Sequence, residues 1–255
     1  MDYFVDKGSV VRQIWGKSDT ILFIFAGAAA EFALNKAVDW LYYTGRLPSD
    51  PLGRLFTTVT YARKIVFSEK GAAHRAIDAM AAIHATVEAK RGYSIPDWAY
   101  RDVLYMLIDY SIRAYEVLER KLTSAEKREV FNVFYRVGHR MGVKDLPTTY
   151  ELWLPDRDKH LQENLQKSNY THDLFSQYKK HLGLIRYAIL REAQTLVVPA
   201  QVRHLLGFRG RSWLWPMLGL YKLSRYVHAD KLFKALLMPP AYKSEISALD
   251  AVPNS

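Results

Sequence analysis

Residues 50–93, DPLGRLFTTVTYARKIVFSEKGAAHRAIDAMAAIHATVEAKRGY, carry the clearest structural signal in the chain. Asp50 can cap a helix and Pro51 suits a first turn, so we expect a helix that runs to about residue 67. Gly71 marks the turn that follows, and a second helix is expected over about residues 72–90, closed by Arg91-Gly92. The apolar face of that second helix repeats at i, i+3, i+4, i+7 and i+10, with Ile77, Met80, Ala81, His84 and Val87.

The rest of the chain carries helical signals as well. Pro96-Asp97 predicts a helix start that continues to about Lys121, and Thr123-x-x-Glu126 predicts a capping box for the next helix. Gly142 is expected to end that helix. Prolines are expected to divide the remainder into shorter helices, at Pro147, Pro155, Pro199, Pro216 and Pro239-Pro240. We therefore predict one all-α domain over residues 1–255, with a mobile tail at residues 243–255.

The apolar run at residues 21–30, ILFIFAGAAA, is too short to span a bilayer, which needs about 20 residues. We expect a buried helix there. The mixed charge of the preceding residues does not resemble a signal peptide. Together with the missing cysteines, this favours a cytoplasmic protein.

Composition excludes several kinds of chemistry. The 255 residues include no cysteine, so disulfides, Cys-ligated zinc, iron–sulfur clusters and thiolate-ligated haem are all impossible. A metal or haem would have to be held by another residue type, and 8 His and 17 Tyr are present. The formal net charge of +10 comes from Lys and Arg spread along the chain, and no nucleic-acid-binding signature accompanies it, so we expect no nucleic-acid partner.

Familiar catalytic motifs are also missing. The chain has no G-x-S-x-G, no Gly-rich phosphate loop, no H-E-x-x-H and no Glu-x-x-His pair. No two histidines are four residues apart. Asp156 and His160 have that spacing, but charged residues lie between them and we expect a solvated turn.

Arg54, Thr58 and His84 form the one constellation that points to a site. Arg54 and Thr58 share a helix face at i, i+4, which Tyr61 continues. A cation in a first turn opposes the helix dipole by a few tenths of a kcal/mol, so an anion near Arg54 would explain its position. His84 lies on an apolar face, where an imidazole needs a hydrogen-bond partner or a metal. From the residues alone, a core histidine and a surface arginine remain the simpler alternatives.

Residues 50–153 resemble the haem oxygenase domain of the MpaB-like proteins and the latex-clearing (rubber) oxygenases. The resemblance rests on residues 50–93, on IRAYEVLERKLTSAEKREVF and on RVGHRMGVKDLPTTYELW, with weaker likeness in AGAAAEFAL and LLMPPAY. It implies a globin-like all-α domain around a b-type haem. His84, in the context IHATV, would be the proximal iron ligand, and Arg54 and Thr58 would lie beside the haem.

The resemblance implies a haem b-dependent oxygenase or oxidase that acts, with dioxygen or peroxide, on a hydrophobic small molecule such as an alkene or isoprenoid. Rubber-cleaving members carry a lysine where this chain has Thr57. Tyr61 and His139 are candidates for catalytic acid or base by residue type only. Two alternatives are a haem-free lipid- or isoprenoid-binding protein and a haem sensor or carrier without turnover.

Residues 209–225 could also meet a membrane. WLWPMLGLY at residues 213–221 is short, aromatic and flanked by cations, namely Arg209, Arg211, Lys222 and Arg225. Tryptophan, tyrosine and basic side chains suit the membrane interface, so peripheral contact is expected here. A core helix with a basic rim explains the same pattern.

Overall fold

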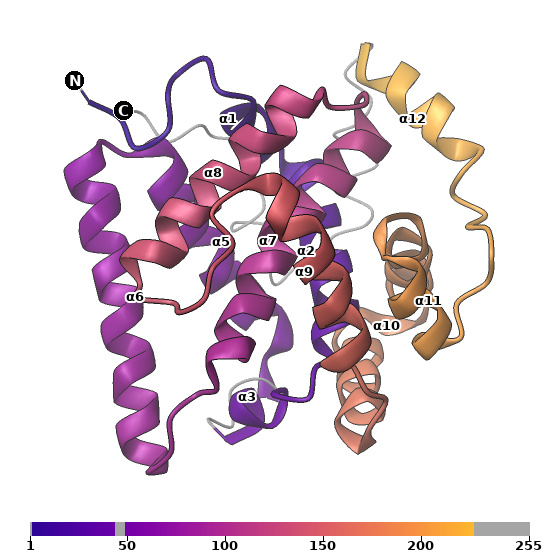
Figure 1. Cartoon of the computed structure of the whole chain (residues 1–255). Coiled ribbons are helices and arrows are strands. Elements are labelled where there is room, and N and C mark those ends of the chain that lie inside the picture. Colours follow the sequence, from indigo (N-terminus) through magenta and orange to yellow (C-terminus); the bar gives the residue numbers. More distant parts are fainter. Residues whose placement is uncertain (1, 44–48, 227–255) are drawn as a thin grey trace.

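The computed structural model describes residues 2–43 and 49–226, with the backbone alone for Leu41, Pro51, Leu52, Arg54, Leu55 and residues 223–226. All regular elements in this part are helices (Figure 1). Their bounds are α1 (Val10–Trp15), α2 (Ser18–Phe32), α3 (Asp39–Tyr43), α5 (Pro51–Phe67), α6 (Lys70–Arg91), α7 (Asp97–Leu118), α8 (Ser124–Arg140), α9 (Tyr150–Glu163), α10 (Asn169–Val197), α11 (Ala200–Leu206) and α12 (Met217–Tyr226). The all-α prediction is confirmed, whereas the predicted tail at residues 243–255 lies outside the described residues.

The predicted helix caps are present. Asp50 caps α5, with its Oδ1 accepting from the Gly53 amide at 2.8 Å. Thr123 and Glu126 form the predicted capping box at the start of α8. Gly92 closes α6 with a φ of 76°, a backbone conformation that glycine adopts without strain.

Two predicted breaks are wrong. Gly71 does not mark the turn, because it is the second residue of α6 and the turn lies at Ser68 and Glu69. Pro155 lies inside α9 rather than between helices. It is the sixth residue of that helix, so its missing amide removes a hydrogen bond only near the start, where α9 has just begun. The actual interruption occurs in α10 at Gly183, whose φ of 74° and ψ of 172° kink the helix. Pro199 does separate α10 from α11, as expected.

The core is built around α2 and α7, which cross in the middle of the molecule (Figure 1). The apolar run at residues 21–30 is the buried helix that was expected, and Ile21 and Ile24 are fully buried in it. None of the helices in the described part is long and apolar enough to cross a bilayer. A hydrophobic cluster extends from Phe4 to Val202 around this pair of helices.

Gly27 allows α2 and α7 to approach each other closely. A Cβ atom at this position would lie 2.3 Å from the Tyr110 ring and 3.0 Å from Val197. Both neighbours are themselves buried and have little room to move.

We therefore expect Gly27→Ala to lower the free energy of unfolding by about 1–3 kcal/mol through overpacking. Gly71→Ala is the matched control, since a Cβ there meets only Arg75 at 3.6 Å and the helix gains propensity. Chemical denaturation of both variants measures the difference. Equal stability of the two variants would contradict the close packing of α2 on α7.

Candidate functional site

The helices α5 and α6 form a hairpin, with only Ser68 and Glu69 between them. Their ends next to this turn are firmly packed. The buried side chains there are Ile65, Val66 and Phe67 from α5, and Ala73, Ala76 and Ile77 from α6. This closed end of the hairpin belongs to the main hydrophobic core.

The open end of the hairpin, away from the turn, is packed differently. From Met80 to Arg91, α6 has no buried residue, although it carries apolar side chains such as Ile83 and Val87. The predicted apolar face of α6 is therefore buried only at Ile77. The open half is also lined by small residues, because Ala81, Ala82, Ala85 and Ala89 follow one another along it. The described part of the chain therefore covers this half of α6 less than the half next to the turn.

His84 lies in this open half. Its ring is partly buried and its Nδ1 atom is shielded from solvent. The edge of the ring meets Tyr100 at the start of α7, with the ring centroids 5.3 Å apart. The structure therefore holds His84 between α6 and α7, without burying it in the core.

Tyr100 is in turn fixed by Glu88, one turn further along α6. The Tyr100 hydroxyl donates to Glu88 Oε1 at 3.2 Å, and the Ile95 amide donates to the same oxygen at 2.7 Å. Burial, reinforced by the Glu88 charge, raises the pKa of the Tyr100 hydroxyl, so it stays protonated and remains a donor. This chain of contacts ties the loop before α7 to the helix that carries His84.

The positions of Arg54 and Thr58 follow from the hairpin. Arg54 lies about 20 Å from the turn along α5, and His84 lies about 21 Å from it along α6, at 1.5 Å per residue. The two backbones are thus at similar depth in the open end. The side chain of Thr58 is partly buried on α5, while that of Arg54 lies outside the described part.

The two residues chosen by type lie in different places. Tyr61 is partly buried on α5, one turn beyond Thr58, and so belongs to the hairpin. His139 is exposed near the end of α8, in a hollow that it shares with His74. His74 precedes His84 by ten residues, or about 15 Å along α6. His139 therefore lies toward the closed end, away from His84.

The pair Asp156 and His160 corrects the prediction of a solvated turn. Both residues lie in α9, and His160 is buried. Its Nδ1 contacts the Asp102 carboxylate of α7, which also accepts from Asn35 at 2.8 Å. Asp156 accepts from the Tyr105 hydroxyl at 2.5 Å. The sequence pattern could not show that His160 is buried, because its partner carboxylate, Asp102, is 58 residues away in the sequence.

A second buried polar cluster joins three helices. Arg157 of α9 donates to both carboxylate oxygens of Glu31 on α2, at 2.6 Å each, and to Asp109 on α7 at 3.1 Å. The Tyr110 hydroxyl also donates to Glu31, at 2.8 Å. Burial alone lowers the pKa of the Arg157 guanidinium, but the two carboxylates outweigh it and the net shift is upward. The sequence did hint at this cluster. Glu31 directly follows the apolar run of α2, and a charge buried at that point requires a partner.

The chain matches the catalytic-domain model of the family described as ER-bound oxygenase mpaB/B'/Rubber oxygenase over residues 14–229. The chain belongs to this family. The match covers more than four-fifths of the sequence and includes the whole α5–α6 hairpin. A search of curated proteins gives no match. The mpaB/rubber oxygenase resemblance of residues 50–153 is thus confirmed, and with it the assignment of the chain to a family of oxygenases.

The buried cluster gives a stability prediction. Arg157→Ala leaves the carboxylates of Glu31 and Asp109 without their cation, and we expect it to cost about 3–5 kcal/mol. Arg128→Ala is the control, because Arg128 pairs with Glu151 at the surface and should cost at most about 1 kcal/mol. Urea unfolding distinguishes the two. A loss no larger than that of the control would show that the cluster does not hold the three helices together.

Proposed function

We propose that this member of the mpaB/rubber oxygenase family is a haem b-dependent oxygenase or oxidase that acts on a hydrophobic small molecule. The observation that carries the proposal is the open end of the α5–α6 hairpin. There a partly buried histidine lies on a helix half that is rich in alanine and has no fully buried residue in the described part of the chain. A flat apolar group beside α6 would complete its packing.

The donor set fits a haem better than a metal ion held by protein alone. In the described part of the chain, no group of three or more His, Asp or Glu side chains could hold a metal ion. A haem can be held by a single histidine nitrogen of the protein, and His84 would supply it. Ala81, on the same face of α6 as His84, would let a macrocycle approach the helix there.

The chain's own residues would hold the group and shape its surroundings. His84 would ligate the iron, while Tyr100 and Glu88 limit the tilt of its imidazole. Arg54, at the same depth of the hairpin, would neutralise a propionate, which accounts for a cation in the first turn of α5. Thr58 would lie on the face of α5 turned toward the group. Bound haem supplies the activation of dioxygen or peroxide for attack on the substrate.

The proposal does not extend to the chemistry of the rubber-cleaving members. Thr57, which stands where they carry a lysine, donates its hydroxyl to the Gly53 carbonyl of its own helix at 3.0 Å. A hydroxyl engaged in this way does not replace a mobile ammonium group as a proton donor. A hydrophobic substrate other than rubber, such as a smaller alkene or isoprenoid, is therefore our proposal.

Haem binding tests the proposal directly. Purified after expression with a haem precursor, the protein should show a Soret band, and His84→Ala should lose most of it because the iron loses its axial nitrogen. Added imidazole should restore the band in His84→Ala, which separates ligand loss from misfolding. His172→Ala, at an exposed position of α10, is the control and should keep the wild-type spectrum.

Three outcomes would refute the proposal, each in a different way. A colourless wild-type protein that co-purifies with lipid would indicate a haem-free lipid- or isoprenoid-binding protein. A Soret band without oxygen uptake on any alkene would indicate a haem sensor or carrier. A Soret band that is unchanged in His84→Ala would remove this histidine as the iron ligand.

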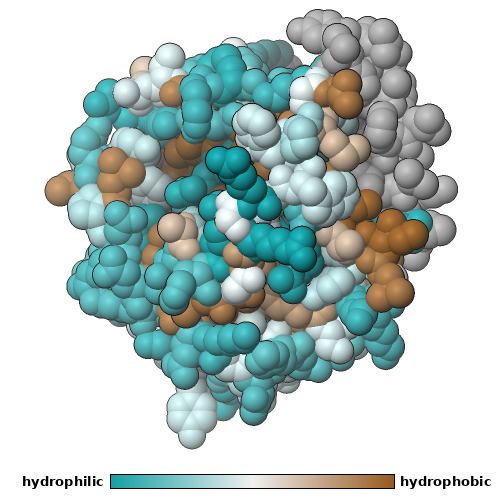
Figure 2. Space-filling model, turned by 90° about the vertical axis from the view of Figure 1, so that its right-hand side faces the viewer, coloured by the Kyte–Doolittle hydropathy of each residue, from teal (hydrophilic) through white to brown (hydrophobic). Residues whose placement is uncertain are grey.

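We also propose that the chain contacts an anionic membrane surface through residues 209–225. Two hydrogen bonds attach this segment to the rest of the protein. The Trp213 amide donates to Glu192 of α10 at 3.0 Å, and the Tyr221 hydroxyl donates to Asp19 of α2 at 3.0 Å. Its large side chains nevertheless point outward: Trp213 is 49%, Trp215 68%, Met217 44% and Leu220 68% exposed. Figure 2 shows hydrophobic side chains among polar ones on this face of the molecule.

The charges beside this segment favour an anionic lipid partner. Arg209 and Arg211 are exposed immediately before the two tryptophans, and an indole beside a cation is typical of interfacial segments. A surface site of this kind would bring an enzyme close to a substrate dissolved in lipid. The side chain of Arg225 lies outside the described part.

Vesicle flotation tests this contact. On phosphatidylcholine vesicles that contain phosphatidylserine, the double variant Trp213→Ser/Trp215→Ser should float several-fold less than the wild type, because it loses two interfacial anchors. Tyr93→Ser, at an exposed aromatic residue elsewhere, is the control. Binding should also fall at 0.5 M salt as the arginine contribution is screened. Equal flotation of the double variant and the wild type would exclude this surface as the docking site.

A further inference from the structure

A basic hollow lies at the closed end of the hairpin, where the start of α6 meets the end of α8. Its volume is about 350 Å³, and its described lining consists of Phe4, Lys70, His74, Tyr135, Arg136, His139 and Arg140. Five of these seven residues are basic and none is acidic. The hollow is shallow and open, and four of its five basic residues are exposed, but the excess of cations gathered around one depression favours an anionic ligand.

The start of α6 strengthens this electrostatic argument. Lys70, His74 and Arg75 fall within its first two turns. The N-cap residue Glu69 is acidic but exposed, and its side chain does not cap the helix, while no acidic residue follows in the first turn. The N-terminus of a helix carries partial positive charge, so cations there cost a few tenths of a kcal/mol each. A bound anion would turn this unfavourable arrangement into a favourable one, since helix N-termini are ready-made anion sites.

The side chains of the hollow are partly pre-arranged. Arg136 donates to the Phe4 carbonyl at 2.8 Å and lies over the Phe4 ring, 4.5 Å from its centroid, so its guanidinium is held in place. Two acidic residues do pair with lining cations from the rim: Asp78 with Arg140 at 2.7 Å, and Asp2 with Lys70 at 3.4 Å. Both acids are largely exposed, which leaves their charge screened by water.

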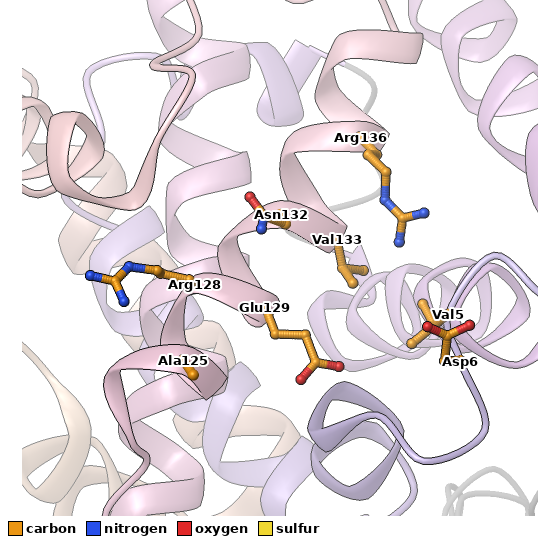
Figure 3. Close-up of a pocket in the computed structure, with 8 residues that line it drawn as sticks. All are labelled: Val5, Asp6, Ala125, Arg128, Glu129, Asn132, Val133 and Arg136. Atoms are coloured by element: carbon orange, nitrogen blue, oxygen red, sulfur yellow. The ribbon is translucent and has the colours of Figure 1, made fainter.

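The neighbouring hollow provides a contrast within the same protein. It measures about 470 Å³ and shares Arg136 with the basic hollow. Figure 3 shows Glu129 reaching from α8 toward Asp6, whereas Arg128 points away from both, so two carboxylates accompany Arg136 in this hollow. An anion would be repelled from this mixed site, and the positive excess is thus specific to the basic hollow.

We propose that the basic hollow binds the phosphate group of a small molecule. Phosphate suits the site because its several oxygens can accept from Arg, Lys and His together, and arginine recognises it with paired donors. The wall formed by Tyr135 could contact an organic part of the same molecule. The hollow lies about 15 Å along α6 from His84, so this binding site is separate from the proposed oxygenase site and does not rest on it.

Titration calorimetry of the full chain with pyrophosphate, at constant ionic strength set by chloride, tests the proposal. We expect saturable binding that Arg140→Gln and His139→Gln each weaken by roughly tenfold, the typical loss for one hydrogen bond to a charged group. Arg128→Gln is the matched control, since it also removes an α8 cation paired with one surface acid, but outside the hollow. This control should bind as the wild type does.

A second arm distinguishes the source of the phosphate. If the natural ligand is a lipid headgroup, phosphatidic acid vesicles should bind and Arg140→Gln, but not Arg128→Gln, should reduce that binding. Absence of any binding above chloride in both arms would overturn the proposal. Equal loss of binding in Arg140→Gln and Arg128→Gln would also overturn it, because it would reflect net charge and not a site.

Discussion

Arg157 places a positive charge in a core that excludes water, and the carboxylates of Glu31 and Asp109 meet it from two other helices. The pair with Glu31 satisfies both oxygens at once, so it restricts the rotation of α2 against α9 as well as their distance. Buried ion pairs of this kind add little net stability compared with apolar packing, but they tolerate few alternative arrangements. We therefore expect this cluster to fix how α2, α7 and α9 pack on one another.

The hairpin itself separates two kinds of surface along one helix. The closed end of α6 joins the core and presents cations at its start, while the open end carries His84 on a face that the described part of the chain covers only in part. Helices α2 and α7 cross closely at Gly27 in the centre of the molecule. Helix α6 lies at the edge (Figure 1). A helix at the edge is free to build a site from a face that a central helix would bury.

Local signals allowed much of the fold to be predicted, because caps and periodicity act over a few residues. Asp50 and the Thr123–Glu126 box confirm this. The sequence could not predict that the apolar face of α6 is buried only in part, since that depends on which helices reach it. His160 was misplaced for the same reason: its carboxylate partner comes from another helix. The family was predicted correctly from residues 50–153. The roles of Arg54, Thr58 and His84 at the site remain predictions.

The uneven packing of α6 has a thermodynamic consequence. Ordering a helical residue costs about 1–2 kcal/mol of conformational entropy, and burial of its side chain normally offsets that cost. From Met80 to Arg91 the chain offers little such burial. Contacts from other parts of the chain, such as the Arg91–Asp39 pair, supply some of that free energy. A ligand that bound beside His84, as we propose, would add to it, so occupation of the proposed site would further stabilise the helical state of the open end.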